Sequence, residues 1–383
     1  MIDAGLFIRE LKRCGIDFYA GVPDSLLRPF CDWLGANVPA SSHVIAANEG
    51  AAVALAAGHF LATGRPGCVY MQNSGEGNAV NPLVSLTDAD VYGIPLLLVI
   101  GWRGRPGVHD EPQHVKQGKI TLQLLDVLGI PYSVLSDDWA EASAQIDEAC
   151  RVLSSNRVYA LVVRKNVFNS VAVIPSTSSV ILSEAEESLS REEAIRIIAD
   201  ATGPSDVIVS STGMISRELY EFREAAGTGH GRDFLTVGSM GHASQIALGI
   251  SLEQPWRRVW CFDGDGAVLM HLGSLAVAGT RAGAGFVHVV FNNGAHDSVG
   301  GQPTAALQID LPGVAKALGY QRVISVSSKT ALLSALSVIP SAPSVIPSEA
   351  EEAPTLWKIS RIPAVPPKFP SIWKGECASM RLG

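Results

Sequence analysis

The stretch Cys261-Phe262-Asp263-Gly264-Asp265-Gly266 decides the fold of the second half of the chain, together with Phe291-Asn292-Asn293-Gly294 further on. An apolar run precedes each motif, at 258–262 and 286–291, and residues 267–282 between them have the pattern of one helix. This order of strand, tight turn, helix and strand is that of a βαβ unit, whose two parallel strands end at the same edge of a sheet. Because parallel sheets bind ligands at that edge, both motifs predict a site there.

The residue types at this edge suit Mg²⁺ and a diphosphate. Gly264 and Gly266 let backbone amides approach an anion, and the helix that follows points its positive end toward it. Asp265 and Asn293 offer a carboxylate and an amide oxygen, which are hard ligands for Mg²⁺ beside phosphate oxygens. A plain turn with a solvent-facing Asn pair is the simpler interpretation. The pairing of both motifs across one crossover favours the site.

Composition describes a globular protein of two or perhaps three domains. The chain has 383 residues, of which 47% are hydrophobic and 17% charged, enough to bury large cores. The net charge of -8 argues against a nucleic-acid surface. No apolar run reaches the ~18 residues that span a membrane, and the N-terminus lacks the pattern of a signal peptide. We therefore expect a cytoplasmic protein without nucleic-acid or membrane partners.

Six cysteines are scattered along the chain without a Cys-x-x-Cys pair. Several lie in apolar segments, so reduced thiols in the core of a cytoplasmic protein are the favoured interpretation. The six are Cys14, Cys31, Cys68, Cys150, Cys261 and Cys377.

The first half of the chain alternates helix-like and strand-like segments. Fully apolar strands that alternate with helices imply a parallel sheet covered on both faces. Polar and glycine residues follow several of the strands, so this half should also have a ligand-binding edge. Helical patterns cover 2–14, 26–34 and 51–62, and strands are predicted at 17–20, 43–47, 68–72, 96–100 and 158–163.

The second half repeats the α/β pattern after a linker at 171–189 that is rich in Ser, Val, Pro and Glu. Nearly the same sequence returns within 337–353, and both copies are interpreted as low-complexity connections without chemistry. The fold class is therefore α/β, with doubly wound parallel-sheet domains at 1–170 and 190–383. Besides the opening βαβ unit, strands are predicted at 207–210, 234–237, 323–326 and 356–359, and helices at 190–201, 311–318 and 329–336.

Further motifs carry a resemblance to a known family. The first half contains Gly21-Val22-Pro23-Asp24-Ser25, Asn48-Glu49-Gly50, Asn73-Ser74-Gly75, Gly101-Trp102-Arg103-Gly104 and Asp110-Glu111-Pro112-Gln113-His114. The second half contains Gly238-Ser239-Met240-Gly241-His242-Ala243 and Asn292-Asn293-Gly294-Ala295-His296-Asp297-Ser298. Together they closely resemble the phosphonopyruvate decarboxylase family of thiamine diphosphate enzymes, over about 1–170 and 190–330. Sulfopyruvate decarboxylases are close cousins of that family.

The resemblance implies a pyrimidine-binding domain followed by a diphosphate-binding domain, with thiamine diphosphate and Mg²⁺ as cofactors. It implies decarboxylation of a small 2-oxo acid, 3-phosphonopyruvate, to phosphonoacetaldehyde and CO₂ in phosphonate biosynthesis. A sulfopyruvate decarboxylase and a catalytically impaired homologue are the alternatives. Active sites of this family form between two chains, so we expect a homodimer or a homotetramer.

The resemblance also implies roles for individual residues. Glu49 would bond the aminopyrimidine ring and promote its imino tautomer, a task for a partly buried carboxyl group. The simpler interpretation of Glu49 is an acidic residue at a helix start. Asp265 and Asn293 would bind Mg²⁺ with the backbone carbonyl of Ala295. The remaining cofactor contacts would be Ser211, Thr212, Gly238, Met240, Gly264 and Gly266.

Substrate residues follow less directly from the motifs. Asp24, Ser25 and His114 are candidates for acid–base or substrate contacts, and Gln113 and His296 are further candidates. Arg103 would suit a phosphonate, although a surface arginine is the simpler interpretation. The sequence departs from the family at Glu76, where an apolar residue is usual and a carboxylate would repel an anionic substrate. It also departs in the two low-complexity insertions and in the tail beyond Pro363.

Overall fold

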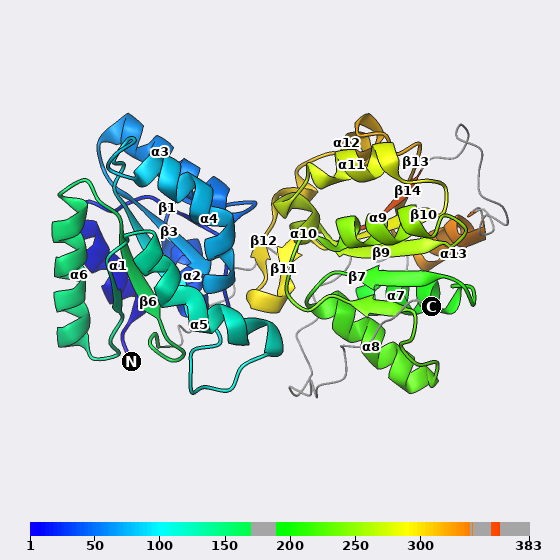
Figure 1. The fold of residues 1–383 in the computed structure, drawn as a ribbon, viewed down its shortest axis with the longest axis horizontal. Helices are drawn as coiled ribbons and strands as arrows, with labels where there is room; N and C mark the ends of the chain where they lie inside the picture. The colour runs from blue at the N-terminus through cyan, green and yellow to red at the C-terminus, as the bar shows by residue number, and fades with distance from the viewer. Residues whose placement is uncertain (170–188, 338, 340–353, 361–383) are drawn as a thin grey trace. The chain divides into compact units, whose positions relative to one another are not determined.

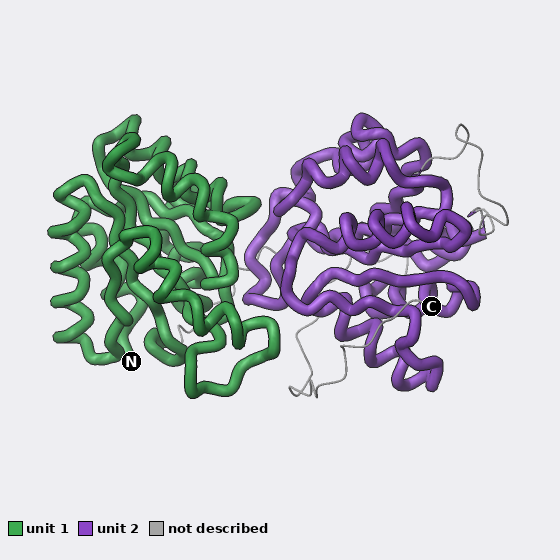
Figure 2. The backbone as a smooth tube through the Cα atoms, viewed as in Figure 1, with its two compact units in different colours: residues 1–179 green, residues 180–383 purple. Residues whose placement is uncertain are grey.

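The computed structural model describes residues 1–169, 189–337, 339 and 354–360. The chain divides into two compact units, residues 1–179 and 180–383 (Figure 2). All but the last residue of the expected linker at 171–189 lies outside the described residues, as do most of the insertion at 337–353 and the tail beyond Pro363. Among the described helices, none is both long and apolar enough to cross a membrane.

Unit 1, in which Figure 1 labels α1 to α6 and the strands β1, β3 and β6, is built on a six-stranded parallel sheet with the order β2-β1-β3-β4-β6-β5. Helices cover both faces because successive strand residues point to opposite sides. Cys68 packs with α1, α2 and α6, whereas the next residue, Val69, packs with α3, α4 and α5. The strands are β1 Tyr19–Gly21, β2 His43–Ile45, β3 Gly67–Gln72, β4 Leu96–Gly101, β5 Tyr132–Val134 and β6 Tyr159–Val163. The helices are α1 Ala4–Arg13, α2 Arg28–Asn37, α3 Glu49–Thr63, α4 Glu76–Pro82, α5 Pro112–Val127 and α6 Trp139–Leu153.

Unit 2 has a second six-stranded parallel sheet, with the order β13-β14-β10-β9-β7-β8. Numbered within each unit, and without the separate two-stranded hairpin of β11 and β12, both sheets have the order 2-1-3-4-6-5. The strands are β7 Val207–Ser210, β8 Asp233–Leu235, β9 Val259–Gly264, β10 Phe286–Asn292, β11 Ala295–His296, β12 Gln302–Pro303, β13 Arg322–Val326 and β14 Thr355–Ser360. The helices are α7 Arg191–Asp200, α8 Met214–Ala226, α9 Ala243–Glu253, α10 Asp265–Met270, α11 Ser274–Arg281, α12 Leu311–Ala317 and α13 Lys329–Ser337.

These elements confirm the predicted fold class, and several differ from the prediction in detail. The prediction of one helix over 267–282 is wrong, because α10 ends at Met270 and α11 begins at Ser274. The chain leaves helical dihedral angles at His271, whose ring stacks on that of His242 with 4.5 Å between the ring centroids. The edge strand β5 has no counterpart among the predicted strands. Its three half-buried residues are too few to form a recognisable apolar run.

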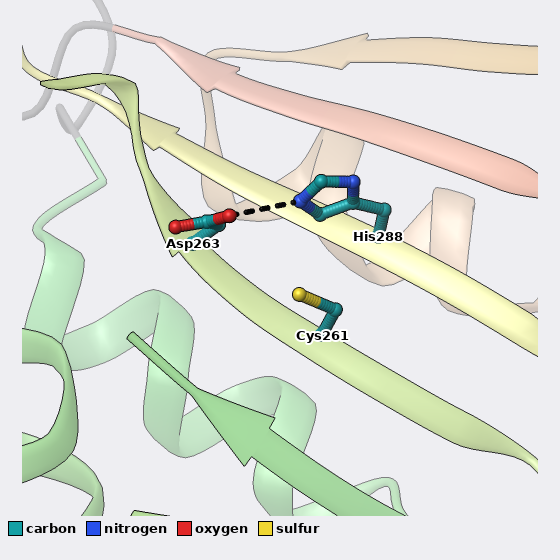
Figure 3. A group of neighbouring side chains, drawn as sticks. All are labelled: Cys261, Asp263 and His288. Carbon is teal, nitrogen blue, oxygen red and sulfur yellow. Dashed lines mark hydrogen bonds and ion pairs between the residues drawn. The ribbon is translucent and has the colours of Figure 1, made fainter. Parts of the chain in front are cut away.

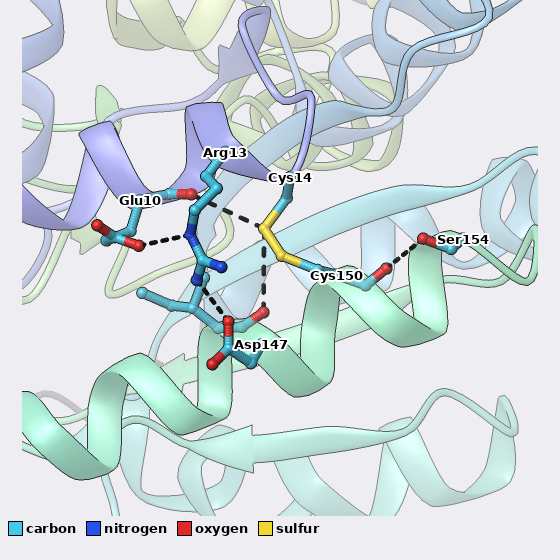
Figure 4. Close-up of a disulfide and its surroundings, with 7 residues drawn as sticks. Glu10, Arg13, Cys14, Asp147, Cys150 and Ser154 are labelled. Carbon is cyan, nitrogen blue, oxygen red and sulfur yellow. Dashed lines mark hydrogen bonds and ion pairs between the residues drawn. A yellow bond between two sulfur atoms is a disulfide. The ribbon is translucent and has the colours of Figure 1, made fainter.

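A disulfide between Cys14 and Cys150 corrects the expectation that all cysteines are reduced (Figure 4). It joins the end of α1 to α6 across 136 residues, with 5.2 Å between the two Cα atoms. Arg13 pairs with Asp147 across the same two helices. Cys31, Cys68 and Cys261 are free and buried, as expected. The pairing depends on how two distant helices pack, which the spacing of cysteines along the chain does not reveal.

Candidate functional site

The carboxyl ends of β8, β7, β9 and β10 lie next to one another in unit 2, because these strands are neighbours in a wholly parallel sheet. This arrangement brings the predicted cofactor residues of this half to one edge. The Ser211 amide donates to the Phe262 carbonyl at 2.7 Å. The Gly238 amide donates to the Thr212 hydroxyl at 3.0 Å, which ties the ends of β7 and β8 together.

Asp265 begins α10 directly after β9 and is buried. Its carboxylate accepts a hydrogen bond from the Thr304 hydroxyl. Burial raises the pKa of Asp265, while the bonds from Thr304 and from backbone amides, including that of Asn293, oppose the rise. A buried carboxylate without a cationic partner is costly, and a divalent cation would remove that cost. The residues therefore fit a site for Mg²⁺.

Asn293 follows β10 and is held by a chain of charged groups that the sequence analysis did not identify. Its side-chain amide donates to Asp297 at 2.6 Å, and Asp297 accepts a bond from Arg191 at 3.0 Å. Arg191 also binds Glu218 through two hydrogen bonds of 2.8 and 2.9 Å. Arg191 and Glu218 are both buried. With the amide nitrogen of Asn293 fixed in this way, its Oδ1 is left for a ligand and accepts only the Ala295 amide, at 3.1 Å.

Met240 and His296 lie against Gly266 at this edge. A side-chain carbon on Gly266 would come within 2.8 Å of the His296 ring and 3.5 Å of the Met240 methyl group. Burial lowers the pKa of His296, so its ring is neutral near pH 7. An apolar thioether and a neutral imidazole therefore flank the glycine that the sequence assigns to a diphosphate.

A buried polar cluster lies along the same strands (Figure 3). One ligand-type atom each from Cys261, Asp263 and His288 lies within 4.8 Å of the others. Both ring nitrogens of His288 already have partners, Tyr320 at 3.1 Å and Asp263 at 3.4 Å. Asp263 also accepts the Gly264 amide at 3.1 Å. We interpret the cluster as a hydrogen-bond network that fixes the turn before Asp265.

Glu49 is the first residue of α3 in unit 1, directly after its N-cap residue Asn48. Asn48 caps the helix by accepting the Ala51 amide at 2.8 Å. The Glu49 side chain is buried against Gly75. A larger residue at position 75 would collide with the carboxyl group of Glu49. It accepts one hydrogen bond, from Asn78 at 2.7 Å, and burial raises its pKa. A buried carboxyl group with a raised pKa is a candidate for proton transfer.

Asp24 lies after β1 and is completely buried beneath Gly101 at the end of β4. One carboxyl oxygen accepts the Leu26 amide at 2.9 Å, and the other has no hydrogen-bond partner. Burial raises the pKa of Asp24 to about 6. Ser25, the next residue, is exposed and accepts a hydrogen bond from Arg103 at 3.0 Å. Asp24 is thus a second proton-exchanging group, one residue from a polar surface.

Arg103 is engaged within unit 1. Two of its guanidinium nitrogens bind the carboxylate of Asp110, and a third donates to Ser25. Asp110 raises the pKa of Arg103, and the bonds from Arg103 and nearby amides hold the pKa of Asp110 below its usual range despite burial. The guanidinium fork that the sequence offers to a phosphonate therefore faces a carboxylate. His114, at the start of α5, is buried, and burial lowers its pKa to about 4, so it is neutral.

Glu76 begins α4 and is buried, with no hydrogen-bond partner for either carboxyl oxygen. Gln117 and Thr121 lie close enough to oppose the rise in its pKa, but each also donates to another group. The Gln117 amide binds the Asn73 carbonyl at 2.8 Å, and the Thr121 hydroxyl binds the Gln117 carbonyl at 2.9 Å. Burial raises the pKa of Glu76 to about 8. Glu76 is therefore mostly protonated at pH 7, which weakens the expected repulsion of an anionic substrate.

Comparisons with known proteins agree with this division into two sites. Residues 4–125 match the family model "Thiamine pyrophosphate enzyme, N-terminal TPP binding domain", and residues 211–346 match "Thiamine pyrophosphate enzyme, C-terminal TPP binding domain". Thiamine pyrophosphate is another name for thiamine diphosphate.

Three curated proteins match most of the chain. A phosphonopyruvate decarboxylase of Streptomyces viridochromogenes is 39% identical, covering 88% of this chain and 85% of its own. A phosphonopyruvate decarboxylase of Streptomyces hygroscopicus is 35% identical, covering 88% and 84%. A sulfopyruvate decarboxylase of Methanosarcina acetivorans is 27% identical, covering 86% and 85%.

Proposed function

Because this chain belongs to the phosphonopyruvate decarboxylase family of thiamine diphosphate enzymes, we propose that it decarboxylates 3-phosphonopyruvate to phosphonoacetaldehyde and CO₂. The observation that carries the proposal is Glu49, a buried carboxyl group with a raised pKa and a single side-chain donor, Asn78. A group that only capped a helix would gain nothing from burial, since charge–dipole stabilisation needs the ionised form.

The edge of unit 2 is the proposed anchor for the cofactor. Asp265, the Asn293 side chain and the Ala295 carbonyl would hold Mg²⁺, and the amides near Gly264 and Gly266 would meet the diphosphate. Ser211 and Thr212 would contact the same diphosphate. The Gly238 carbonyl and the Met240 side chain would contact the rings.

The edge of unit 1 is the proposed site of proton transfer. Bound thiamine diphosphate supplies the electron sink for loss of CO₂, which no side chain provides. Glu49 would exchange a proton with a ring nitrogen of the cofactor. Asp24, with its pKa near 6, would deliver the proton to the product carbon, and the neutral His114 and Ser25 would position the substrate.

The proposal includes an assembly, a cytoplasmic homodimer or homotetramer whose sites form between chains. In that assembly a Glu49→Gln chain and an Asp265→Ala chain would complement each other, because a mixed dimer would have one site with both lesions and one with neither. Exchange of subunits would be followed by mass spectrometry. Exchange without recovery of activity would contradict a shared site.

The deciding experiment is an assay of the purified protein with thiamine diphosphate and Mg²⁺. Phosphonopyruvate and sulfopyruvate would be supplied separately, and the aldehyde and CO₂ measured. We expect turnover of phosphonopyruvate at the higher kcat/KM, and a turnover ~10²–10⁴-fold lower with the Glu49→Gln variant. If sulfopyruvate is turned over equally well or better, the protein is a sulfopyruvate decarboxylase instead. If neither compound is turned over, it is a catalytically impaired homologue.

A further inference from the structure

A pocket of about 460 Å³ lies at the carboxyl edge of the sheet in unit 1. The loops that follow β1, β4, β5 and β6 line it, so it is formed within one compact unit. Cations outnumber carboxylates among its charged lining residues. These are Arg103, Arg105, Arg164 and Lys165 against Asp110 and Asp137. A pocket with walls of low dielectric and an excess of one charge concentrates ligands of the opposite charge.

The positively charged side chains of the pocket differ in whether a carboxylate of the protein already pairs with them. Arg103 is paired with Asp110 and bonded to Ser25, so it forms part of the wall. Arg164 has a buried Nε atom with no hydrogen-bond partner. Among the described residues, the carboxylate that pairs with Arg164 is the exposed Asp137, at 3.7 Å, which is beyond hydrogen-bond length. The side chains of Arg105 and Lys165 make no hydrogen bond or ion pair with any described residue.

We propose that this pocket binds the phosphonate group of the substrate, with Arg164 as its principal ligand and Arg105 and Lys165 as supporting charges. The proposal rests on the proposed function and names the residues that select the substrate. A guanidinium fork matches two oxygens of a tetrahedral oxyanion, and the partly exposed Arg164 side chain donates no hydrogen bond to any described residue.

The pocket lies next to the candidate proton donor, which suits the short distance between the phosphonate and keto groups of phosphonopyruvate. Ser25 and Leu26 line the pocket directly after Asp24, the candidate proton donor. One methylene separates the phosphorus atom of phosphonopyruvate from its keto carbon. A phosphonate held in this pocket would therefore keep the keto carbon close to the β1 loop. Because a phosphonate carries up to two negative charges and a sulfonate one, the excess of cations favours the phosphonate.

The test compares wild type with Arg164→Gln and with Arg164→Lys, which keeps the charge but loses the fork. Arg151→Gln is the matched control, since Arg151 is an exposed arginine of α6 paired with Glu148. We expect Arg164→Gln to raise KM for phosphonopyruvate about 10- to 100-fold and to change kcat less than about 3-fold. The KM of Arg164→Lys should lie between those of wild type and Arg164→Gln. Arg151→Gln should match wild type.

Direct binding separates this inference from the proposed function. Methylphosphonate, methanesulfonate and inorganic phosphate would each be titrated into the holoenzyme by calorimetry. If Arg164→Gln weakens the binding of methylphosphonate, the pocket is a phosphonate site even if phosphonopyruvate is not turned over. If inorganic phosphate binds more tightly than methylphosphonate, the ligand of the pocket is phosphate instead. If phosphonopyruvate is turned over but KM and methylphosphonate affinity are unchanged in Arg164→Gln, the pocket assignment is wrong. If Arg164→Gln does not fold, the exposed Lys165→Gln gives the same comparison with a smaller expected change.

Discussion

The two sheets have the same strand order, and a buried acidic residue begins the helix after the third strand of each. In unit 2 this residue is Asp265, and in unit 1 it is Glu76. Asp265 accepts hydrogen bonds from a hydroxyl group and from backbone amides. No described residue makes a well-aligned hydrogen bond to either oxygen of Glu76, and burial raises its pKa to about 8 although Gln117 and Thr121 oppose the rise. Each sheet thus has a buried carboxyl group at the start of the α-helix that follows its third strand. The ionised form is better stabilised at Asp265 than at Glu76.

This difference extends along both edges. In unit 1, Asp24 and Glu49 are also buried and have raised pKa values, which backbone amides oppose at Asp24 and Asn78 opposes at Glu49. In unit 2, Asp297 and Glu218 are both paired with Arg191. Asp265 also has a raised pKa, but a hydroxyl group and backbone amides oppose the rise and a bound cation would keep it ionised, whereas Asp24, with a pKa of about 6, is suited to proton transfer. The comparison assigns proton chemistry to unit 1 and anchoring to unit 2.

The largest effect is expected at Asp265. Replacement by Ala removes a charged Mg²⁺ ligand, so Mg²⁺-dependent binding of thiamine diphosphate should be lost and turnover should fall more than about 10³-fold. Calorimetric titration of the cofactor with and without Mg²⁺ measures this. Asp200→Ala, an exposed position at the end of α7, is the control. Unchanged cofactor affinity in Asp265→Ala would falsify the anchoring role.

Glu49→Gln should have the next largest effect, and of a different kind. The amide keeps the shape but does not carry the proton, so turnover should fall ~10²–10⁴-fold while cofactor affinity changes little. Exchange of the cofactor's thiazolium C2 proton in deuterated buffer, followed by quenched NMR, measures the step directly. Glu192→Gln, at an exposed first-turn position of α7, is the control. Exchange as fast as in wild type would reduce Glu49 to a helix-start carboxylate.

A smaller effect is expected at Thr304, whose hydroxyl group donates a hydrogen bond to Asp265. Groups that orient a metal ligand typically contribute ~10–100-fold to metal affinity, so Thr304→Val should weaken Mg²⁺ binding by about that factor. Thr304→Ser keeps the hydroxyl group and should stay close to wild type. Equal Mg²⁺ affinity in the Val and Ser variants, measured by calorimetry, would show that Asp265 needs no support from Thr304.

The sequence predicted the parts of this comparison that depend on local pattern. Apolar runs located the central strands, and polar motifs after them located both edges. The partners of the charged residues depend on packing between distant segments, so Arg191 beside Asp297 and the disulfide of Cys14 were not predicted. The sequence also left Arg103 available to a substrate, because nothing local shows that Asp110 folds back on it.

Glu76 should show the smallest effect on turnover and a distinct effect on stability. Its pKa is about 8 in the fold against an ordinary value of 4.5, so the folded protein binds this proton more tightly than the unfolded chain. The stabilisation is fully present below about pH 4.5 and is lost as the pH rises through about 8, a change on the order of a few kcal/mol. Near pH 6.5 the carboxyl group is neutral, so Glu76→Gln should change KM less than about 3-fold.

Thermal unfolding of wild type and Glu76→Gln from pH 5 to pH 9 tests this directly. The variant lacks the titrating group, so its Tm should exceed that of wild type by a margin that grows with pH, and the KM of wild type should rise above that of the variant beyond pH 8. Glu148→Gln, a partly exposed position in α6, should track wild type throughout. A constant difference in Tm across this range would mean that Glu76 is already ionised at pH 5. An ionised Glu76 would need a hydrogen-bond donor, just as Asp265 has the Thr304 hydroxyl group. Glu76 and Asp265 would then no longer differ in how their ionised forms are stabilised.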